Sequence, residues 1–278
     1  MDFSIITPSF RNSEWLKLCI ASVADQQAVT LEHIVQDAGS DDGTLDWLPS
    51  DPRVKAFIEK DSGMYDAINR GLRRAKGDLL AYLNCDEQYF PGALQRVRDY
   101  FANHPETDVL FAGAVVVDDQ ANYLCHRHAL KPTAQHIWFR FSVLTCATFF
   151  RRRIIDDLRV FFDTNYRAVG DFHWVRSLMQ AGAKIAVLDE FTSLFMDDGK
   201  NLCLSPTGRA EMDMIKRMTP AWLRITKPLW IGMHRWRRLR AGHFTLKPAR
   251  YEIYTLASPR NRISLDVQQP SGIWKTRI

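Results

Sequence analysis

The chain has 278 residues, of which 46% are hydrophobic and 25% are charged, as in a globular protein with a sizeable core. No run approaches the roughly 18 apolar residues that span a bilayer, and residues 1–6 lack the basic start and apolar run of a signal peptide. Five scattered cysteines argue against a disulfide framework or a structural zinc site and favour a reducing compartment. We therefore expect a cytosolic protein.

Charge is distributed unevenly along the chain. The formal net charge is +5, yet ten basic residues and no acidic residue lie between Met214 and Tyr251. Of the 37 Lys and Arg, 27 remain outside this window against 32 Asp and Glu, so the remainder has a net charge of −5. These patterns predict an acidic domain, residues 1–210, followed by a basic, Trp-rich extension, residues 211–278.

Strands and helices alternate in the first ninety residues. Short apolar strands are predicted at 3–7, 32–36, 54–58 and 78–83. Helices are predicted at about 13–27, after the polar turn 37–43, and at about 64–75. Repeated βαβ units imply an α/β fold with a mainly parallel sheet and helices on both faces. Ligands of such sheets bind at the carboxyl ends of the strands.

Polar residues cluster at the ends of three predicted strands. They are Thr7 and Ser9, then Asp37, then Asn84, Asp86 and Glu87. Two adjacent carboxylates after a buried strand are costly unless a cation compensates their charge. Oxygen ligands of this kind suit Mn²⁺ or Mg²⁺. A solvated loop in which Asp86 and Glu87 merely end the strand is the alternative.

The predicted helix at 64–75 carries a polar stripe. Its members recur at helical spacing: Asp66, Asn69, Arg70 and Arg73. A solvent-facing stripe would explain this pattern. Asp66 and Asn69 lie nearer the helix start, where they could instead face a pocket.

Four segments together resemble family 2 glycosyltransferases of the GT-A fold. More narrowly, they resemble the bacterial sugar transferases of colanic-acid, exopolysaccharide and lipopolysaccharide synthesis. The segments are 4–10, 33–44, 61–71 and 75–87. Their shared order and spacing make the resemblance specific, although each segment alone is modest.

The resemblance implies roles for these residues. Thr7 and Ser9 would line the pocket for the nucleotide base, and Asp37 would accept a hydrogen bond from it, which suits N3–H of uracil. The donor would also be held by Asp61, Asp66 and Asn69. Asn84-Cys85-Asp86 stands at the Asp-x-Asp position of the family, so Asp86 would bind the metal. Glu87 replaces a more usual Asp and would contact the metal or the ribose.

A catalytic base is expected later in the chain. A strand is predicted at 145–151, and the helical spacing of Phe172, Val175 and Leu178 places Asp171 at a helix start. An N-cap role explains Asp171 on local grounds, while the resemblance implies the base of an inverting reaction.

Residues 197–201 resemble a flexible segment of the family in which Lys200 could meet the pyrophosphate. A plain loop explains them equally well.

The histidines and the basic extension leave alternatives open. His126, His128, His136 and His173 match no zinc spacing, so we expect acceptor-pocket or surface histidines. Aromatic and basic residues alternate after residue 220, which suits an anionic membrane surface, nucleic acid or a packed end of the domain. Pro220 and Pro228 preclude a single long helix there.

The sequence therefore predicts an inverting, metal-dependent glycosyltransferase of cell-surface polysaccharide or lipopolysaccharide synthesis. Its donor would be a nucleotide sugar, with UDP-sugar favoured, and its acceptor a glycan or lipid-linked glycan at the inner face of the cytoplasmic membrane. A catalytically inactive nucleotide-sugar-binding protein is the first alternative. A nucleic-acid-binding protein is less favoured, because acidic strand ends repel phosphate unless a cation intervenes.

Overall fold

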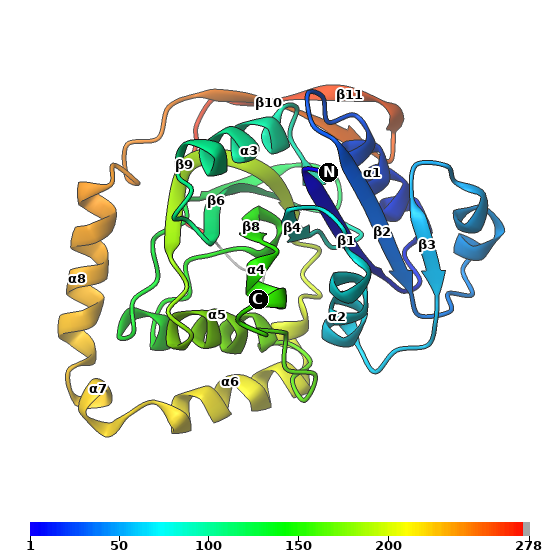
Figure 1. Ribbon diagram of the computed structural model, residues 1–278. Helices are drawn as coiled ribbons and strands as arrows, with labels where there is room; N and C mark the ends of the chain where they lie inside the picture. Colours follow the sequence, from blue (N-terminus) through cyan, green and yellow to red (C-terminus); the bar gives the residue numbers. More distant parts are fainter. Residues whose placement is uncertain (275–278) are drawn as a thin grey trace.

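A nine-stranded mixed sheet forms the centre of the protein, whose computed structural model describes residues 1–274 (Figure 1). The strand order is β3-β2-β1-β4-β8-β6-β9-β5, with β7 paired to β6. Strands β1, β2, β3, β4, β6 and β9 share one direction, and β5, β7 and β8 oppose it. The bounds are β1 Phe3–Ser9, β2 Leu31–Asp37, β3 Lys55–Ile58, β4 Leu79–Tyr82, β5 Gln88–Tyr89, β6 Val109–Val117, β7 Tyr123–Arg127, β8 Thr148–Arg151 and β9 Ile185–Met196.

Helices cover both faces of this sheet, which confirms the predicted α/β architecture. Their bounds are α1 Ser13–Ala24, α2 Met64–Arg74, α3 Ala93–Asn103, α4 Arg153–Asp156, α5 Gly170–Gln180, α6 Pro206–Met218, α7 Ala221–Ile225 and α8 Lys227–Arg240. Neighbouring residues of β1 point to opposite faces: Ile5 packs with α1 and α3, and Ile6 packs with α2 and α5. Burial on both faces explains why the parallel strands are apolar throughout.

Two local predictions were wrong. The helix expected after residues 37–43 is replaced by two 3₁₀ turns, Thr44–Asp46 and Leu48–Ser50. Asp42 accepts hydrogen bonds from Thr44, a local pattern that competes with helix formation. In addition, β1 does not end at Pro8. The strand continues to Ser9. Proline, which has no N–H to donate, is tolerated at position 8 because β4 pairs only with residues 3–6 and so offers no acceptor beside Pro8.

The C-terminal segment combines helices with a hairpin that was not predicted. Helices α6, α7 and α8 form an arc around one side of the molecule, interrupted near Pro220 and Pro228 as expected (Figure 1). Strands β10 (Ala249–Thr255) and β11 (Ser258–Val267) then pair antiparallel. Arg262 in β11 donates two hydrogen bonds to Asp25, of 2.7 and 2.8 Å, and so ties the hairpin to the end of α1. Residues 275–278 of the predicted extension lie outside the described residues.

Candidate functional site

The carboxyl ends of β1, β2 and β4 meet at one edge of the sheet. Ser9, the last residue of β1, lies opposite Asp37, the last residue of β2. Tyr82, the last residue of β4, lies opposite Ile6. The polar residues that follow these strands are therefore neighbours, as a parallel sheet requires.

Asp37 organises the turn after β2. It is fully buried, and its Oδ1 accepts hydrogen bonds from the amides of Gly39 and Ser40, at 2.9 and 2.8 Å. Its Oδ2 accepts from the hydroxyls of Ser9 and Ser40, at 2.9 and 2.8 Å. A carboxylate has about four acceptor positions, so these contacts fix it firmly. Thr7 is also fully buried, with its hydroxyl 2.8 Å from Nε2 of His33.

The segment after β4 holds two adjacent carboxylates, Glu87 buried and Asp86 half-buried. Glu87 is only 1% exposed, and its Oε2 accepts a hydrogen bond from the amide of Asn84 at 2.8 Å. Burial, followed by the charge of Asp86, raises the pKa of Glu87 above its usual value. Burial also raises the pKa of Asp86, and the charge of Asp198 adds to this effect.

These carboxylates fit a divalent cation. Glu87 Oε1 and Asn84 Oδ1 are buried without a hydrogen-bond partner among residues 1–274. Within the same residues, neither Asp86 nor Glu87 forms an ion pair with a basic side chain. Buried oxygen atoms that lack both donors and countercharge are what a hard cation such as Mg²⁺ or Mn²⁺ satisfies.

The predicted donor-binding residues near α2 are engaged within the protein. Asp61 accepts a hydrogen bond from the amide of Gly63 at 2.8 Å, and burial raises the pKa of its carboxyl. Asp66 accepts from the amide of Ser62 at 3.0 Å and from Arg70 at 2.9 Å. Burial alone would raise the pKa of Asp66, but these two donors outweigh it and the pKa is lowered.

Asn69 does not face an open pocket. Its side-chain nitrogen donates to the carbonyl of Phe162 at 2.8 Å, and its oxygen accepts from the amide of Phe162 at 3.0 Å. The ring of Phe162 stacks against Tyr65 and Trp174, with centroid distances of 5.5 and 4.7 Å. Asn69 therefore anchors an aromatic layer beside the strand ends.

Asp171 lies in the first turn of α5, whose N-cap is Val169. The residue is therefore inside the helix and is not its N-cap. Its Oδ1 accepts the amide of Phe172 at 2.8 Å, and its own amide donates to the hydroxyl of Tyr65 at 3.3 Å. Burial raises the pKa of Asp171 to about 6. A group that changes charge near neutrality can accept a proton during catalysis.

Tyr82 connects Asp171 with the carboxylates after β4. Burial raises the pKa of Tyr82 well above its usual value, and the charges of both Asp171 and Glu87 contribute to the rise. Asp171 and Glu87 thus lie within electrostatic reach of one phenol. The loop after β9 also approaches, since Asp198 raises the pKa of Asp86. In that loop Lys200 is exposed, and its amide donates to Asp198 at 2.8 Å.

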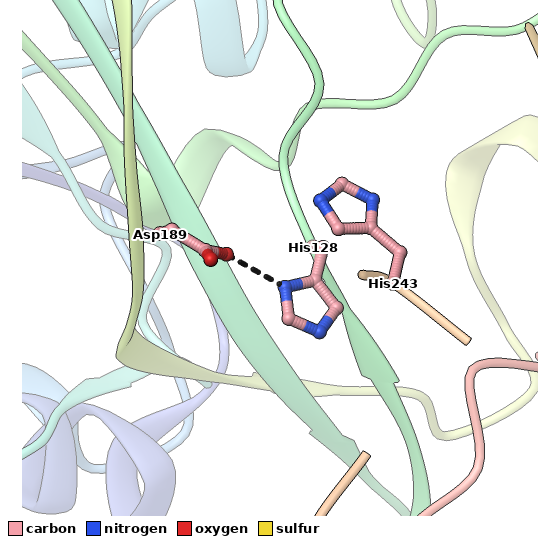
Figure 2. Close-up of side chains that lie close together, drawn as sticks. All are labelled: His128, Asp189 and His243. Carbon is pink, nitrogen blue, oxygen red and sulfur yellow. Dashed lines mark hydrogen bonds and ion pairs between the residues drawn. The ribbon is translucent and has the colours of Figure 1, made fainter. Parts of the chain in front are cut away.

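A second group of side chains was missed by the sequence analysis: His128, Asp189 and His243 (Figure 2). One potential ligand atom from each lies within 4.8 Å of the others. However, the two imidazole rings stack almost in parallel, with centroids 4.3 Å apart and an angle of 11°, so their lone pairs do not converge on one point. Nδ1 of His128 lies 3.2 Å from an oxygen of Asp189. Burial is the main cause that lowers the pKa of both His128 and His243, and the charge of Arg238 lowers both further. We interpret this group as two stacked neutral imidazole rings, of which that of His128 hydrogen-bonds to Asp189.

Comparison with known proteins accounts for the arrangement of the strand ends. Residues 4–174 match the family model described as glycosyl transferase family 2. The chain belongs to this family. It is 28% identical over 176 residues to a PGL/p-HBAD biosynthesis glycosyltransferase of Mycobacterium bovis, an alignment that covers 61% of this chain and 66% of the relative, slightly under two thirds of its length. It is also 32% identical over 102 residues to TuaG of Bacillus subtilis, covering 35% of this chain and 40% of TuaG.

Solved structures show the same GT-A fold. The family 2 chain resembles S. aureus TarS 1–349 in complex with UDP, with a TM-score of 0.56, 18% identity and coverage of 77% of this chain and 69% of that one. It also resembles the mannosyltransferase PcManGT from Pyrobaculum calidifontis in complex with GDP-Man and Mn²⁺, with a TM-score of 0.52 and 15% identity. That match covers 88% of this chain and 76% of PcManGT.

Proposed function

We propose that this glycosyltransferase is an inverting, metal-dependent enzyme that uses a nucleotide-sugar donor, UDP-sugar first among the candidates. The observation that carries this proposal is the buried, unpaired oxygen set of Asn84 and Glu87 beside Asp86, at the carboxyl end of β4. The UDP, UDP-GlcNAc and GDP-Man bound to the structural neighbours support a nucleoside-diphosphate donor.

Asp86 would be the principal metal ligand, with Glu87 and Asn84 as adjacent oxygen ligands. A bound Mn²⁺ or Mg²⁺ would stabilise the negative charge that develops on the departing diphosphate. Metal binding would also compensate the burial of Glu87, which otherwise favours its protonated form. Lys200, exposed on the loop after β9, would add positive charge next to the diphosphate.

The nucleoside would bind at the ends of β1 and β2. Asp37 is held in place by Ser9 and Ser40, so its orientation is fixed before any ligand arrives. An acceptor carboxylate at this point suits the N3–H of uracil, which would take the place of one of the four protein donors that Asp37 now accepts from. Thr7 and Asn69, both buried, would support the pocket from behind, while Asp61 and Asp66 would border it from the start of α2.

Asp171 would act as the catalytic base. The acceptor hydroxyl is a weak nucleophile, and a carboxylate must take its proton as the new bond forms. Burial holds the pKa of Asp171 at about 6, so this side chain is ionised at neutral pH yet more basic than an exposed aspartate. A single base on the face opposite the departing diphosphate gives inversion at the sugar carbon.

The extension, residues 211–278, would hold the enzyme at an anionic membrane surface where a lipid-linked glycan is the acceptor. Large apolar side chains are exposed along α7 and α8: Trp222, Ile225, Leu229, Met233, Trp236 and Leu239. Exposed basic residues flank them, among them Arg224 and Arg235. This combination suits the headgroup region of a membrane. Among residues 1–274, no helix is long and apolar enough to cross a bilayer.

Cell-surface glycan synthesis is the process that the relatives favour. TuaG is described as a putative teichuronic acid biosynthesis glycosyltransferase, and the mycobacterial relatives are described as PGL/p-HBAD biosynthesis glycosyltransferases. These descriptions support a biosynthetic enzyme whose acceptor is a glycan or a lipid-linked glycan.

Calorimetric titration of UDP, with and without Mn²⁺, tests the donor site. We expect micromolar binding that requires the metal and is lost in Asp86→Ala, whereas Asp46→Asn, an exposed carboxylate outside the site, should bind as the wild type does. A screen of UDP-sugars for turnover follows. Absence of binding by both UDP and GDP would refute the donor site, and binding without turnover would refute the transferase activity.

A further inference from the structure

A small basic pocket lies between α8 and the segment 130–143, away from the residues of the donor site. Five of its lining side chains are basic or imidazole groups: Lys131, His136, Arg140, His234 and Arg237. No acidic residue of the described chain lines it. The rest of the lining is mainly apolar, which strengthens electrostatic interactions inside the pocket.

The two arginines that line this pocket, Arg140 and Arg237, lack countercharges. Neither they nor Arg238, the next residue of α8, form an ion pair with a carboxylate among residues 1–274. Burial lowers the pKa of Arg237 and of Arg238, and the charge of Arg140 lowers the pKa of Arg238 further. Partly desolvated cations that repel one another destabilise the fold unless an anion joins them.

Arg237 is oriented toward this pocket by fixed contacts. One of its Nη atoms lies 2.9 Å from Nδ1 of His136, and the other donates to the carbonyl of Lys131 at 2.6 Å. A guanidinium can only donate, so Nδ1 of His136 must be the acceptor. The hydroxyl of Thr133 lies 2.8 Å from the same nitrogen. This network pre-organises the guanidinium, as anion recognition requires.

His234 supplies a polar atom that the fold leaves unsatisfied. The residue is 7% exposed, and its Nδ1 is buried without a hydrogen-bond partner in the described chain. Burial lowers its pKa to about 4, and the charges of Arg238, Arg140 and Arg237 act in the same direction. The ring is therefore neutral at pH 7 and can donate one N–H to an oxygen atom that enters the pocket.

The pocket has a volume of about 10 Å³, which admits about one oxygen atom the size of a water molecule. We propose that a phosphate group binds at its mouth and places one oxygen atom inside, with Lys131, Arg140 and Arg237 neutralising its charge and His234 donating a hydrogen bond. Several donors converging from different elements suit a tetrahedral oxyanion better than a planar carboxylate. On α8, Leu229, Met233 and Trp236 are exposed and form a face adjacent to the one that carries His234 and Arg237. The phosphate can accordingly belong to a lipid headgroup or to a free ion. The site is independent of Asp86 and Asp171.

Binding of inorganic phosphate to the full chain, measured by calorimetry in EDTA, tests the site. Arg140→Gln is the main variant, because its guanidinium makes no hydrogen bond among the described residues and its loss should leave the fold intact. We expect at least about tenfold weaker binding, equivalent to about 1.4 kcal/mol, because the variant loses a charge-assisted contact to the phosphate. Arg209→Gln, which removes an exposed charge from α6, away from the apolar side chains of α7 and α8, is the matched control and should bind as the wild type does.

Vesicles of phosphatidylcholine with phosphatidic acid separate the two sources of phosphate. Flotation that is lost in Arg140→Gln but kept in Arg209→Gln identifies a lipid headgroup. Flotation equal in both variants, with phosphate binding still dependent on Arg140, identifies a free phosphate. If neither phosphate binding nor flotation distinguishes Arg140→Gln and Arg237→Gln from the Arg209 control, the pocket is not a phosphate site.

Discussion

The side-chain amide of Asn69 makes both of its hydrogen bonds to the backbone of Phe162, one as donor at 2.8 Å and one as acceptor at 3.0 Å. Asn69 is 3% exposed, so this pair of contacts joins α2 to the chain segment before α5 in a water-excluded environment. The ring of Phe162 in turn lies between Tyr65 and Trp174. Asn69 thus controls the position of the aromatic layer on which the site rests.

Replacing Asn69 with alanine should destabilise the protein. The substitution leaves the amide and carbonyl of Phe162 buried and unpaired, each at a cost of about 1–3 kcal/mol. We expect a lower urea midpoint at an unchanged m-value. Asn103→Ala, which removes an exposed amide at the end of α3, is the control and should leave the midpoint within error. A wild-type midpoint for Asn69→Ala would mean that the contact with Phe162 contributes nothing.

The sequence could predict the sheet but not this contact. Apolar strands bounded by polar turns indicate parallel pairing, and that pairing alone brings the ends of β1, β2 and β4 together. In contrast, Asn69 and Phe162 are 93 residues apart, and nothing local to either residue identifies its partner. The helical stripe left open whether Asn69 faces solvent or a pocket, whereas its side chain points to another segment of the backbone.

The hairpin of β10 and β11 was missed for a different reason. Tyr251, Ile253 and Thr255 alternate with more exposed residues, a period-two pattern that could have been recognised. Ile253 is buried against Phe90 and Val115, which belong to strands and loops far away in sequence. The pocket at Arg140 and Arg237 is likewise formed by two distant segments, so the composition of the extension indicated basic charge but not a cavity.

Gly170 permits the close approach of Tyr65 to Asp171. A Cβ atom at this position would lie 2.5 Å from the Tyr65 ring, so either the ring or the start of α5 would have to move. We expect Gly170→Ala to lose about 1–3 kcal/mol of stability through overpacking. We also expect a reduced kcat, because Asp171 is displaced, with UDP affinity retained in calorimetry.

Gly232→Ala is the matched control for this substitution. No atom lies within 4 Å of the added Cβ, and the residue is in the interior of α8. Helix propensity then favours alanine by about 0.5–1 kcal/mol. If Gly170→Ala proves as stable and as active as Gly232→Ala, the contact between Gly170 and Tyr65 does not position Asp171.

The rate of transfer should depend on the ionisation of Asp171. Because burial raises its pKa to about 6, kcat/KM is expected to rise with pH, reach half its limit near pH 6 and level off above. Asp171→Asn should lower kcat by about 10²–10⁴-fold while UDP binding is unchanged. Asp156→Asn, an exposed carboxylate at the end of α4, is the control. A profile that is flat between pH 5 and 8 would exclude Asp171 as the base.

Stability gives an independent measurement of the same ionisation. The pKa of Asp171 is higher in the folded protein than its usual value of 3.8. The contribution of Asp171 to the free energy of unfolding is therefore fully present below pH 3.8 and is lost as the pH rises through about 6. In Asp171→Asn the side chain does not ionise, so the variant does not lose stability in this way. The variant should therefore gain thermal stability relative to the wild type between pH 4 and pH 7. A constant difference in Tm across this range would show that burial does not perturb Asp171.

Membrane association should depend on the apolar side chains of α7 and α8. Ile225 and Leu229 are 80% and 58% exposed, and burial of such a side chain contributes about 1.5–3 kcal/mol. The double substitution to serine should weaken flotation with anionic vesicles by more than about tenfold. Substitution of Met212 and Ile263, exposed on α6 and β11, removes similar apolar area elsewhere and should have no effect. Because basic residues flank the apolar side chains, binding should also fall as salt increases. Equal flotation of both double variants would assign the membrane contact to another surface.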